Sequence, residues 1–176
     1  MTRLPPFSRS TGKGNRRMKI KGITDEGFVN YKVPYMFIST SKCSFKCEKE
    51  SGVSCCQNSH LARGTTYDVD DAELIGRYLA DPITKAIVLG GLEPFDQWSE
   101  LWNFIARLRL EYECKDDVVI YTGYNRDEIE GECIMLMQFP NIVVKFGRYK
   151  PNMKPVFDKV LGVTLASENQ YAVRIS

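Results

Sequence analysis

The sequence predicts an α/β fold with a mostly parallel sheet, and two features carry this prediction. Strand-like and helix-like segments alternate from residue 34 onward, and the strand-like runs are short and nearly continuous in apolar character. Such runs are typical of parallel strands that are covered on both faces. Alternation of strand and helix implies right-handed crossovers, which place consecutive strands in one sheet.

The length of the chain predicts a single domain. Its 176 residues are enough for one compact domain and too few for two of ordinary size. We expect this domain to cover residues 18–176. Residues 1–17 hold five basic residues, no acid, and several prolines and glycines, and they predict a basic disordered tail. The tail is interpreted as a leader before a natural start at Met18 or, alternatively, as a segment that docks on an acidic partner.

Charge and cysteine content narrow the class of protein. Without the five basic residues of the tail, 19 basic residues stand against 22 acidic ones, a net charge of −3, so we expect no nucleic-acid partner. The chain has no apolar run of about 18 residues, and we expect no membrane segment. The N-terminus has no apolar stretch of the kind found in secretory signals, so the six cysteines predict a cytoplasmic protein. In a reducing compartment, clustered cysteines bind metal or do chemistry more often than they form disulfides.

Four buried strands are predicted from aromatic and branched side chains. They cover residues 35–40, 86–89, 118–121 and 142–146. Residues 18–32 predict an N-terminal strand or hairpin, and residues 162–175 predict a closing pair of strands.

Three helices are predicted between the strands by apolar stripes at helical spacing. The first begins at the capping pair Asp70 and Glu73 and ends before Pro82, and the third begins at the same pattern in Asn125 and Glu128. The stripes consist, in chain order, of Leu74, Ile75, Tyr78 and Leu79; Phe95, Trp98, Trp102 and Ile105; and Ile129, Cys133, Leu136 and Met137.

Unusual segments follow each of the four strands. Because ligands bind beyond the carboxyl ends of parallel strands, we expect these segments to meet at one edge of the sheet. In chain order they are a cysteine-rich loop, Gly90-Gly91, Thr122-Gly123 and Gly147.

The cysteine-rich loop predicts an iron–sulfur or zinc site. Four of the six cysteines lie within it, at positions 43, 47, 55 and 56, and thiolates are soft ligands that suit either centre. Neighbouring side chains in an extended chain point apart, so Cys55 and Cys56 are not both expected to reach one centre. Three ligands and one spare cysteine is the simpler arrangement, and it would leave one iron of a cubane open.

The pattern Cys43-x-x-x-Cys47 followed by Cys56-Gln57-Asn58 resembles the cluster motif of the radical S-adenosylmethionine (SAM) enzymes. The resemblance implies a short partial (β/α) barrel, a [4Fe–4S] cluster held by three cysteines, and SAM bound at the open iron. This sequence departs from the family by the residues 48–55 between the second and third cysteines. Cys56 is aligned with the third ligand because of the Cys-x-Asn that it begins, which also implies that Asn58 lines the SAM site. Cys55 is the alternative third ligand, and a structural zinc site of four cysteines is the alternative centre.

The segment Gly90-Gly91-Leu92-Glu93-Pro94 lies between a predicted strand and a helix. Glycines let backbone approach a ligand closely, and a carboxylate can accept from an ammonium group. The segment is similar to the Gly-Gly-Glu-Pro of the radical SAM family, which binds the methionine amino group of SAM. Leu92 is an extra residue, and it leaves open whether the Glu93 side chain or the backbone of 90–92 makes that contact.

Two further residues are candidates for the same pocket. Thr122 either ends its strand or lines the pocket with its hydroxyl group. Lys145 interrupts an apolar strand, and an isolated buried lysine is costly. It either extends its ammonium group to solvent or meets the carboxylate of bound SAM.

The last third of the chain resembles one branch of the radical SAM family, the anaerobic ribonucleotide reductase activating proteins. The small size of the domain and the segments 121–124, 145–149 and 162–170 carry this resemblance. It implies a glycyl-radical activase in which a 5′-deoxyadenosyl radical takes hydrogen from a glycine of the large subunit of the anaerobic (class III) reductase. A one-electron donor such as flavodoxin would reduce the cluster. The alternatives are a radical SAM enzyme that acts on a small molecule and a non-enzymatic iron–sulfur or zinc binding module.

Overall fold

The computed structural model describes residues 16–176. The tail predicted over residues 1–17 lies outside the described residues except for Arg16 and Arg17, and Arg17 is the first residue of β1. The strands are β1 (Arg17–Gly27), β2 (Tyr35–Thr40), β3 (Tyr67–Asp70), β4 (Ala86–Gly91), β5 (Asp117–Tyr121), β6 (Ile142–Phe146), β7 (Val156–Asp158), β8 (Val163–Leu165) and β9 (Tyr171–Arg174). The α-helices are α1 (Lys46–Ser51), α2 (Ser59–Arg63), α3 (Asp71–Ala80), α4 (Trp98–Leu110) and α5 (Glu130–Leu136).

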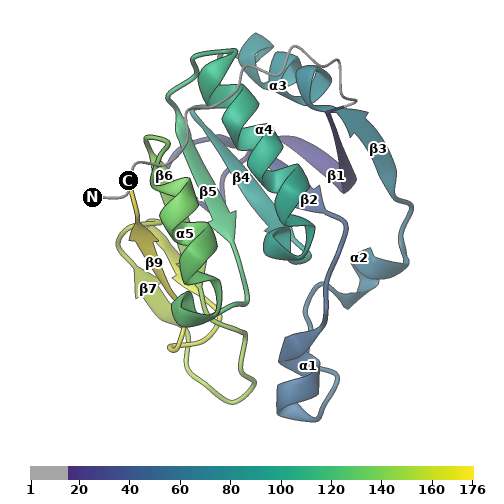
Figure 1. The fold of residues 1–176 in the computed structure, drawn as a ribbon. Coiled ribbons are helices and arrows are strands. Elements are labelled where there is room, and N and C mark those ends of the chain that lie inside the picture. Colours follow the sequence, from purple (N-terminus) through teal and green to yellow (C-terminus); the bar gives the residue numbers. More distant parts are fainter. Residues whose placement is uncertain (1–15) are drawn as a thin grey trace.

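Seven strands form one open sheet in the order β3-β1-β2-β4-β5-β6-β9 (Figure 1). Its centre is parallel, because β2 pairs with β4, β4 with β5 and β5 with β6 in the same direction. The flanking pairs of β1 with β2, β1 with β3, and β6 with β9 are antiparallel. The predicted α/β class with a mostly parallel central sheet is confirmed, and within residues 16–176 the sheet does not close on itself.

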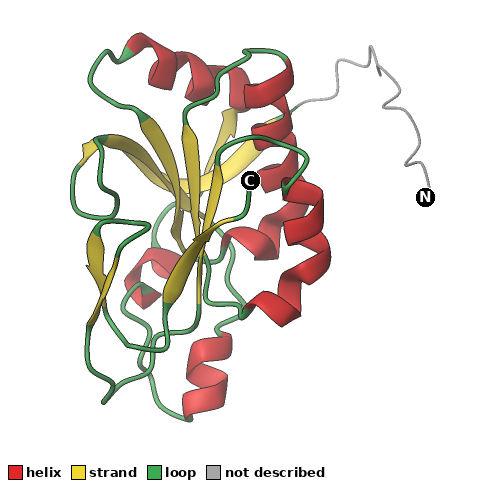
Figure 2. Cartoon of the chain, turned by 90° about the vertical axis from the view of Figure 1, so that its left-hand side faces the viewer, coloured by secondary structure: helices red, strands yellow, loops and turns green. Residues whose placement is uncertain are grey.

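The two faces of the sheet are covered by different kinds of structure. Helices α3, α4 and α5 pack on one face (Figure 1) around apolar strand residues such as Ile38, Leu89 and Ile120. The other face carries Val88 and Val119, and within residues 16–176 no α-helix contributes to the apolar cluster on it. Figure 2 shows the small β7–β8 pair and long loops on that side. The expectation that the parallel strands are buried on both faces is confirmed, since β4 and β5 are almost fully buried.

The three predicted helices are present. Asp70 caps α3 by accepting a hydrogen bond from the backbone N–H of Ala72 at 2.7 Å. A 3₁₀ turn (Pro94–Gln97) leads into α4, and a second one (Arg126–Ile129), closed by the predicted Asn125–Glu128 capping box, leads into α5. The prediction that the apolar stripes pack in the core is wrong for two residues at the ends of their helices. Leu79 is 48% exposed and Met137 is 51% exposed.

The C-terminal strands pair differently from the prediction. Residues 162–175 do contain two strands, but β8 pairs with β7 and β9 pairs with β6. Asp158 helps to fix this arrangement, since its carboxylate accepts hydrogen bonds from the backbone N–H groups of Val160, Leu161 and Ala172. The region 18–32 forms one long strand, β1, followed by a loop. In the described part of the chain, each helix is too short or too polar to cross a bilayer.

Candidate functional site

A cavity of about 450 Å³ lies at the carboxyl edge of the parallel strands, and its volume is within the range of small-molecule sites, about 300–1,000 Å³. All four segments that were expected to meet at this edge contribute to its wall. Of the predicted site residues, the cavity is lined by Cys43, Cys47, Cys56, Asn58, Gly91, Glu93, Thr122 and Lys145. Two predicted residues do not line it: Gly90 lies beside Phe37 and Tyr121, and the Cys55 thiol contacts Ser51.

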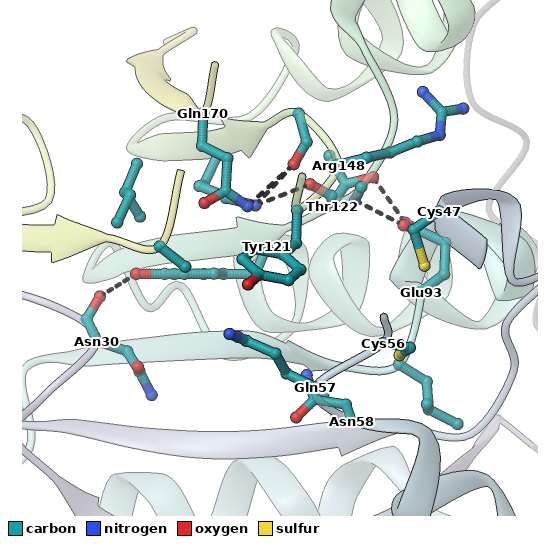
Figure 3. A pocket seen from close by; sticks show the side chains of 18 of the residues that line it. Asn30, Cys47, Cys56, Gln57, Asn58, Glu93, Tyr121, Thr122, Arg148 and Gln170 are labelled. Carbon is teal, nitrogen blue, oxygen red and sulfur yellow. Dashed lines mark hydrogen bonds between the residues drawn. The ribbon is translucent and has the colours of Figure 1, made fainter. Parts of the chain in front are cut away.

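The three thiols reach the cavity from different parts of one loop. Cys43 follows β2, Cys47 lies on α1, and Cys56 precedes α2. Burial raises the pKa of Cys43 to about 11 and that of Cys47 to about 12, so both are neutral thiols until a metal centre displaces their protons. Figure 3 shows Cys47 and Cys56 on the same side of the cavity.

Cys55 has a different environment from its neighbour Cys56. Its Sγ atom lies 3.3 Å from Oγ of Ser51 and 3.7 Å from the carbonyl oxygen of Cys47. These contacts are made within the loop itself, and Cys55 is not part of the cavity wall. The neighbouring cysteines therefore present one sulfur to the cavity and one to the loop.

The donor set fits an iron–sulfur cluster. Three soft thiol ligands share one cavity wall, and thiolates are the usual ligands of such clusters. Among residues 16–176, no three His, Cys, Asp or Glu side chains are grouped tightly enough to hold a single metal ion.

The glycine turn brings backbone close to the cavity. Gly91 has a φ of +83°, which favours glycine, and a Cβ atom there would lie 3.1 Å from the side chain of Ser39. At Gly90 a Cβ atom would lie 3.1 Å from Cβ of Tyr121 and 3.4 Å from the ring of Phe37. Gly90 therefore lets Phe37 and Tyr121, which both line the cavity, approach each other.

Glu93 is a buried carboxylate with three hydrogen-bond donors. It accepts from Oγ1 of Thr122 at 2.7 Å (Figure 3), and from the backbone N–H groups of Gly123 at 2.8 Å and Phe95 at 3.2 Å. Burial nevertheless raises the pKa of Glu93 to about 7, and the three donors act in the opposite direction. Thr122 thus lines the cavity while its hydroxyl group holds Glu93 in place.

Lys145 is also buried, being only 6% exposed, so its ammonium group does not extend to solvent. It donates to the carbonyl oxygen of Gly147 at 3.0 Å and lies 3.4 Å from that of Thr122. Burial lowers the pKa of Lys145 to about 8, and the nearby charge of Glu93 opposes this shift. The cavity wall therefore holds a buried lysine beside a buried acid, and Arg148 is a second buried cation of the wall.

The cavity also contains residues to which the sequence analysis gave no role. Asn30 precedes β2 and is held by Tyr121, whose hydroxyl group donates to the Asn30 carbonyl oxygen at 2.5 Å (Figure 3). Gln170 donates to the carbonyl oxygen of Gly147 at 3.2 Å, and Arg148 lies close to the cysteines. Residues that follow the parallel strands were expected at the site. Asn30 could not be predicted in this way, because it belongs to the loop before β2. Arg148 follows β6, so the same expectation could have pointed to it.

The fold and the site together define an iron–sulfur protein of the α/β class. A family model described as a 4Fe-4S single cluster domain matches residues 30–170, and the chain belongs to this family. The comparison with curated proteins gives no significant match, and neither does the comparison with solved structures. Membership supports a [4Fe–4S] cluster on this chain and is consistent with a redox enzyme.

Proposed function

We propose that this protein is a radical SAM enzyme of the glycyl-radical activase branch. It would cleave SAM reductively to a 5′-deoxyadenosyl radical and generate the glycyl radical on the large subunit of anaerobic (class III) ribonucleoside-triphosphate reductase. One observation carries the proposal: three thiols of the cysteine loop and the glycine turn line the same cavity, while the fourth cysteine, Cys55, is not part of its wall.

The cysteines that line the cavity, Cys43, Cys47 and Cys56, would hold the cluster in this proposal. When bound, the cluster would supply the electron for reductive cleavage of the sulfonium bond of SAM. The protein's own residues bind and orient the substrate and keep water from it. Family membership supports the cluster, and the glycine turn beside it supports SAM, since a simple electron carrier would not need this turn.

The remaining polar residues of the wall would bind the amino-acid part of SAM. The backbone at Gly91 and the carboxylate of Glu93 would accept from its ammonium group, and Lys145 would face its carboxylate. Thr122 orients Glu93 through its hydrogen bond, and Asn58 offers a carboxamide at the cavity wall. Gly90 acts indirectly, through the packing of Phe37 and Tyr121.

We further propose that the open sheet is the partial barrel of this family. Its four parallel strands carry the site, and the reductase subunit would cover the open side of the cavity. Flavodoxin or another one-electron donor of the cytoplasm would reduce the cluster.

An anaerobic assay for 5′-deoxyadenosine tests the proposed function. Protein reconstituted with iron and sulfide is expected to carry about four irons per chain. With dithionite and SAM it should form 5′-deoxyadenosine and methionine, and the purified large reductase subunit should then show the electron paramagnetic resonance signal of a glycyl radical. A protein that holds only zinc would contradict the proposal. So would a protein that cleaves no SAM, either with or without the large reductase subunit. SAM cleavage coupled to a small molecule without the subunit would favour the other radical SAM alternative.

The role of Lys145 in this site can be tested by Lys145→Met. Loss of the buried cation should weaken SAM binding by roughly tenfold, which corresponds to about 1.4 kcal/mol. The change in the cluster's visible spectrum on titration with SAM measures this affinity. Lys85→Met removes an exposed lysine that precedes β4, at the opposite edge of the sheet, and should leave the affinity unchanged. Equal affinities for all three proteins would remove Lys145 from the proposed site.

A further inference from the structure

Helix α1 carries Cys47 but has almost nothing of its own to hold it in place. It spans six residues, none of them buried, and its N-cap Phe45 has a φ of 53° and makes no side-chain cap hydrogen bond. Isolated helices of this length are unstable in water, and helices in proteins depend on packing of an apolar face. The position of α1, and with it that of Cys47, therefore depends on polar contacts with the rest of the domain.

Ser44, just before α1, donates its backbone N–H to Asp96, and Glu48 of α1 accepts from Ser54 and Cys56. Further contacts come from four charged side chains at the carboxyl edge of the sheet, which we name the charge cluster: Lys46, Glu50, Glu128 and Arg148. Glu50 of α1 lies 3.4 Å from Nε of Arg148, and Lys46 lies 3.4 Å from Oε1 of Glu128. Lys46 also lies 4.4 Å from the ring centre of Tyr124. Both ends of α1 thus contact the segments that follow β5 and β6.

The centre of the charge cluster is a bidentate ion pair. Arg148 donates from its two terminal nitrogens to the two carboxylate oxygens of Glu128, at 2.7 and 2.6 Å. Exposed ion pairs contribute little, but the side chain of Arg148 is only 5% exposed. The Glu128 side chain is 26% exposed, so the pair is buried on the Arg148 side only. Its bidentate geometry fixes Arg148 and Glu128 relative to each other, and α1 contacts each of them through Glu50 and Lys46.

Arg148 is also close to the candidate cluster ligands. It lines the main cavity (Figure 3), and together with Cys43 and Cys47 it lines a second, smaller cavity of about 40 Å³. Charges near an iron–sulfur cluster act on its reduction potential, because reduction adds one negative charge to it. A cation here favours the reduced state, and a carboxylate favours the oxidised state.

We infer that the Arg148–Glu128 pair is a positioning unit for the [4Fe–4S] cluster: it docks α1 so that Cys47 faces the cavity, and its balanced charges set the reduction potential. Arg148 and Glu128 act here through the loop and the electric field, without being ligands. The inference rests on membership of the iron–sulfur family and does not require the SAM reaction, so it can fail or hold independently of the proposed function.

Reduction potentials of two variants test the electrostatic part. Arg148→Gln leaves the carboxylate of Glu128 without its partner and should shift the potential to more negative values. Glu128→Gln leaves the cation without its partner and should shift it to more positive values. Both variants break the same ion pair, so a purely structural role predicts shifts of the same sign or none. Anaerobic redox titration of the reconstituted full chain, followed by electron paramagnetic resonance, measures both. Shifts of equal sign, or no shift, overturn the inference.

Hydrogen exchange in the cluster-free protein tests the docking part. Both variants should speed the exchange of backbone amides in residues 43–56 several-fold. Arg148→Lys keeps the charge and loses the bidentate geometry, so it should speed this exchange and leave the potential close to that of the unchanged protein. Unchanged exchange in all three variants overturns the docking role.

A matched control and a milder pair of variants complete the design. Arg174 forms a comparable bidentate pair with Asp117 at the opposite end of β5, and Arg174→Gln should change neither the potential nor the exchange of residues 43–56. If Arg148→Gln fails to fold, the more exposed members of the charge cluster replace it. Lys46→Gln should then shift the reduction potential to more negative values, and Glu50→Gln should shift it to more positive values. Shifts of equal sign, or no shift in either variant, overturn the inference.

Discussion

Adjacent residues of the same type have different roles at this site. Cys56 lines the cavity, while Cys55 contacts Ser51 and the backbone of Cys47. Alternation of side-chain direction along the chain predicts that only one of the two faces a shared centre. The sequence alone left Cys55 and Cys56 as alternative third ligands, and the geometry of the cavity favours Cys56.

Separate alanine variants test this assignment. Cys56→Ala should lose the cluster, since it removes a thiol from the cavity wall. Cys55→Ala should retain it with a small effect on stability, because the Cys55 side chain contacts only its own loop. Iron and sulfide content after anaerobic reconstitution measures the difference. Retention of the cluster by Cys56→Ala would show that the assignment is wrong.

A buried carboxylate far from the cavity predicts an unusual pH dependence of stability. Asp71 is 1% exposed, its carboxylate has no hydrogen-bond partner, and burial raises its pKa to about 6. The unfolded chain releases this proton near the ordinary value of 3.8, whereas the folded protein keeps it until about 6. The free energy of unfolding should therefore fall as the pH rises through this interval and stay lower above it.

Asp71→Asn removes that effect. At pH 7 the variant should be more stable than the unchanged protein by on the order of 2 kcal/mol, and the gain should disappear near pH 4. Urea denaturation at both pH values measures it. Asp127→Asn, at an exposed position, is the control and should show no such difference. A variant that is less stable at pH 7 would mean that the ionised carboxylate is favoured in the folded state.

At the scale of elements, the loop between β1 and β2 is fixed by tyrosine side chains. The hydroxyl group of Tyr35 accepts from the backbone N–H groups of Val29 and Asn30, and Tyr121 donates to the carbonyl oxygen of Asn30. Gly27 makes room for this arrangement, because a Cβ atom there would lie 2.4 Å from the ring of Tyr35. A loop without an apolar pattern thereby becomes part of the cavity wall.

Gly27→Ala should disturb this loop. Its methyl group would displace the buried ring of Tyr35, and overpacking of this kind costs about 1–3 kcal/mol of stability. Gly22→Ala is the matched control in the same strand, since no atom lies within 4 Å of its Cβ position. Thermal unfolding of both variants measures the difference. Equal stability of the two variants would mean that the loop accommodates the methyl group at position 27 without a loss of stability.

At the scale of the whole molecule, the site exists because four parallel strands end at one edge. Cys43, Glu93, Thr122 and Lys145 lie far apart in the sequence, and the parallel pairing of β2, β4, β5 and β6 brings them to one cavity. A group that binds only the folded protein stabilises that state. The cluster should therefore stabilise the whole domain.

We expect anaerobic reconstitution to raise the Tm of the protein, and exposure to air to reverse the gain as the cluster is lost. Cys43→Ala should show no gain, since it removes a cysteine from the cavity wall. Cys114→Ala, which changes a cysteine packed beside the helical core, should keep it. Calorimetry of loaded and unloaded protein gives the comparison. The same Tm in both states would mean that the loop binds the cluster without support from the rest of the fold.

The sequence by itself determined the α/β class, the four parallel strands and the strand ends at which the site lies. These properties follow from local patterns: apolar runs, capping pairs and glycine turns. The same patterns missed β3, β7, α1 and α2, which are short and have no fully buried side chain.

Only the tertiary structure decided which side chains face the cavity. Burial of Lys145, the three donors around Glu93 and the docking of α1 by Arg148 depend on contacts between residues far apart in the chain. The pairing of β8 with β7 and of β9 with β6 has the same origin, since Asp158 binds backbone N–H groups of two separate segments. Local patterns specify the elements, whereas the partners of buried polar groups are set by the packing of the whole chain.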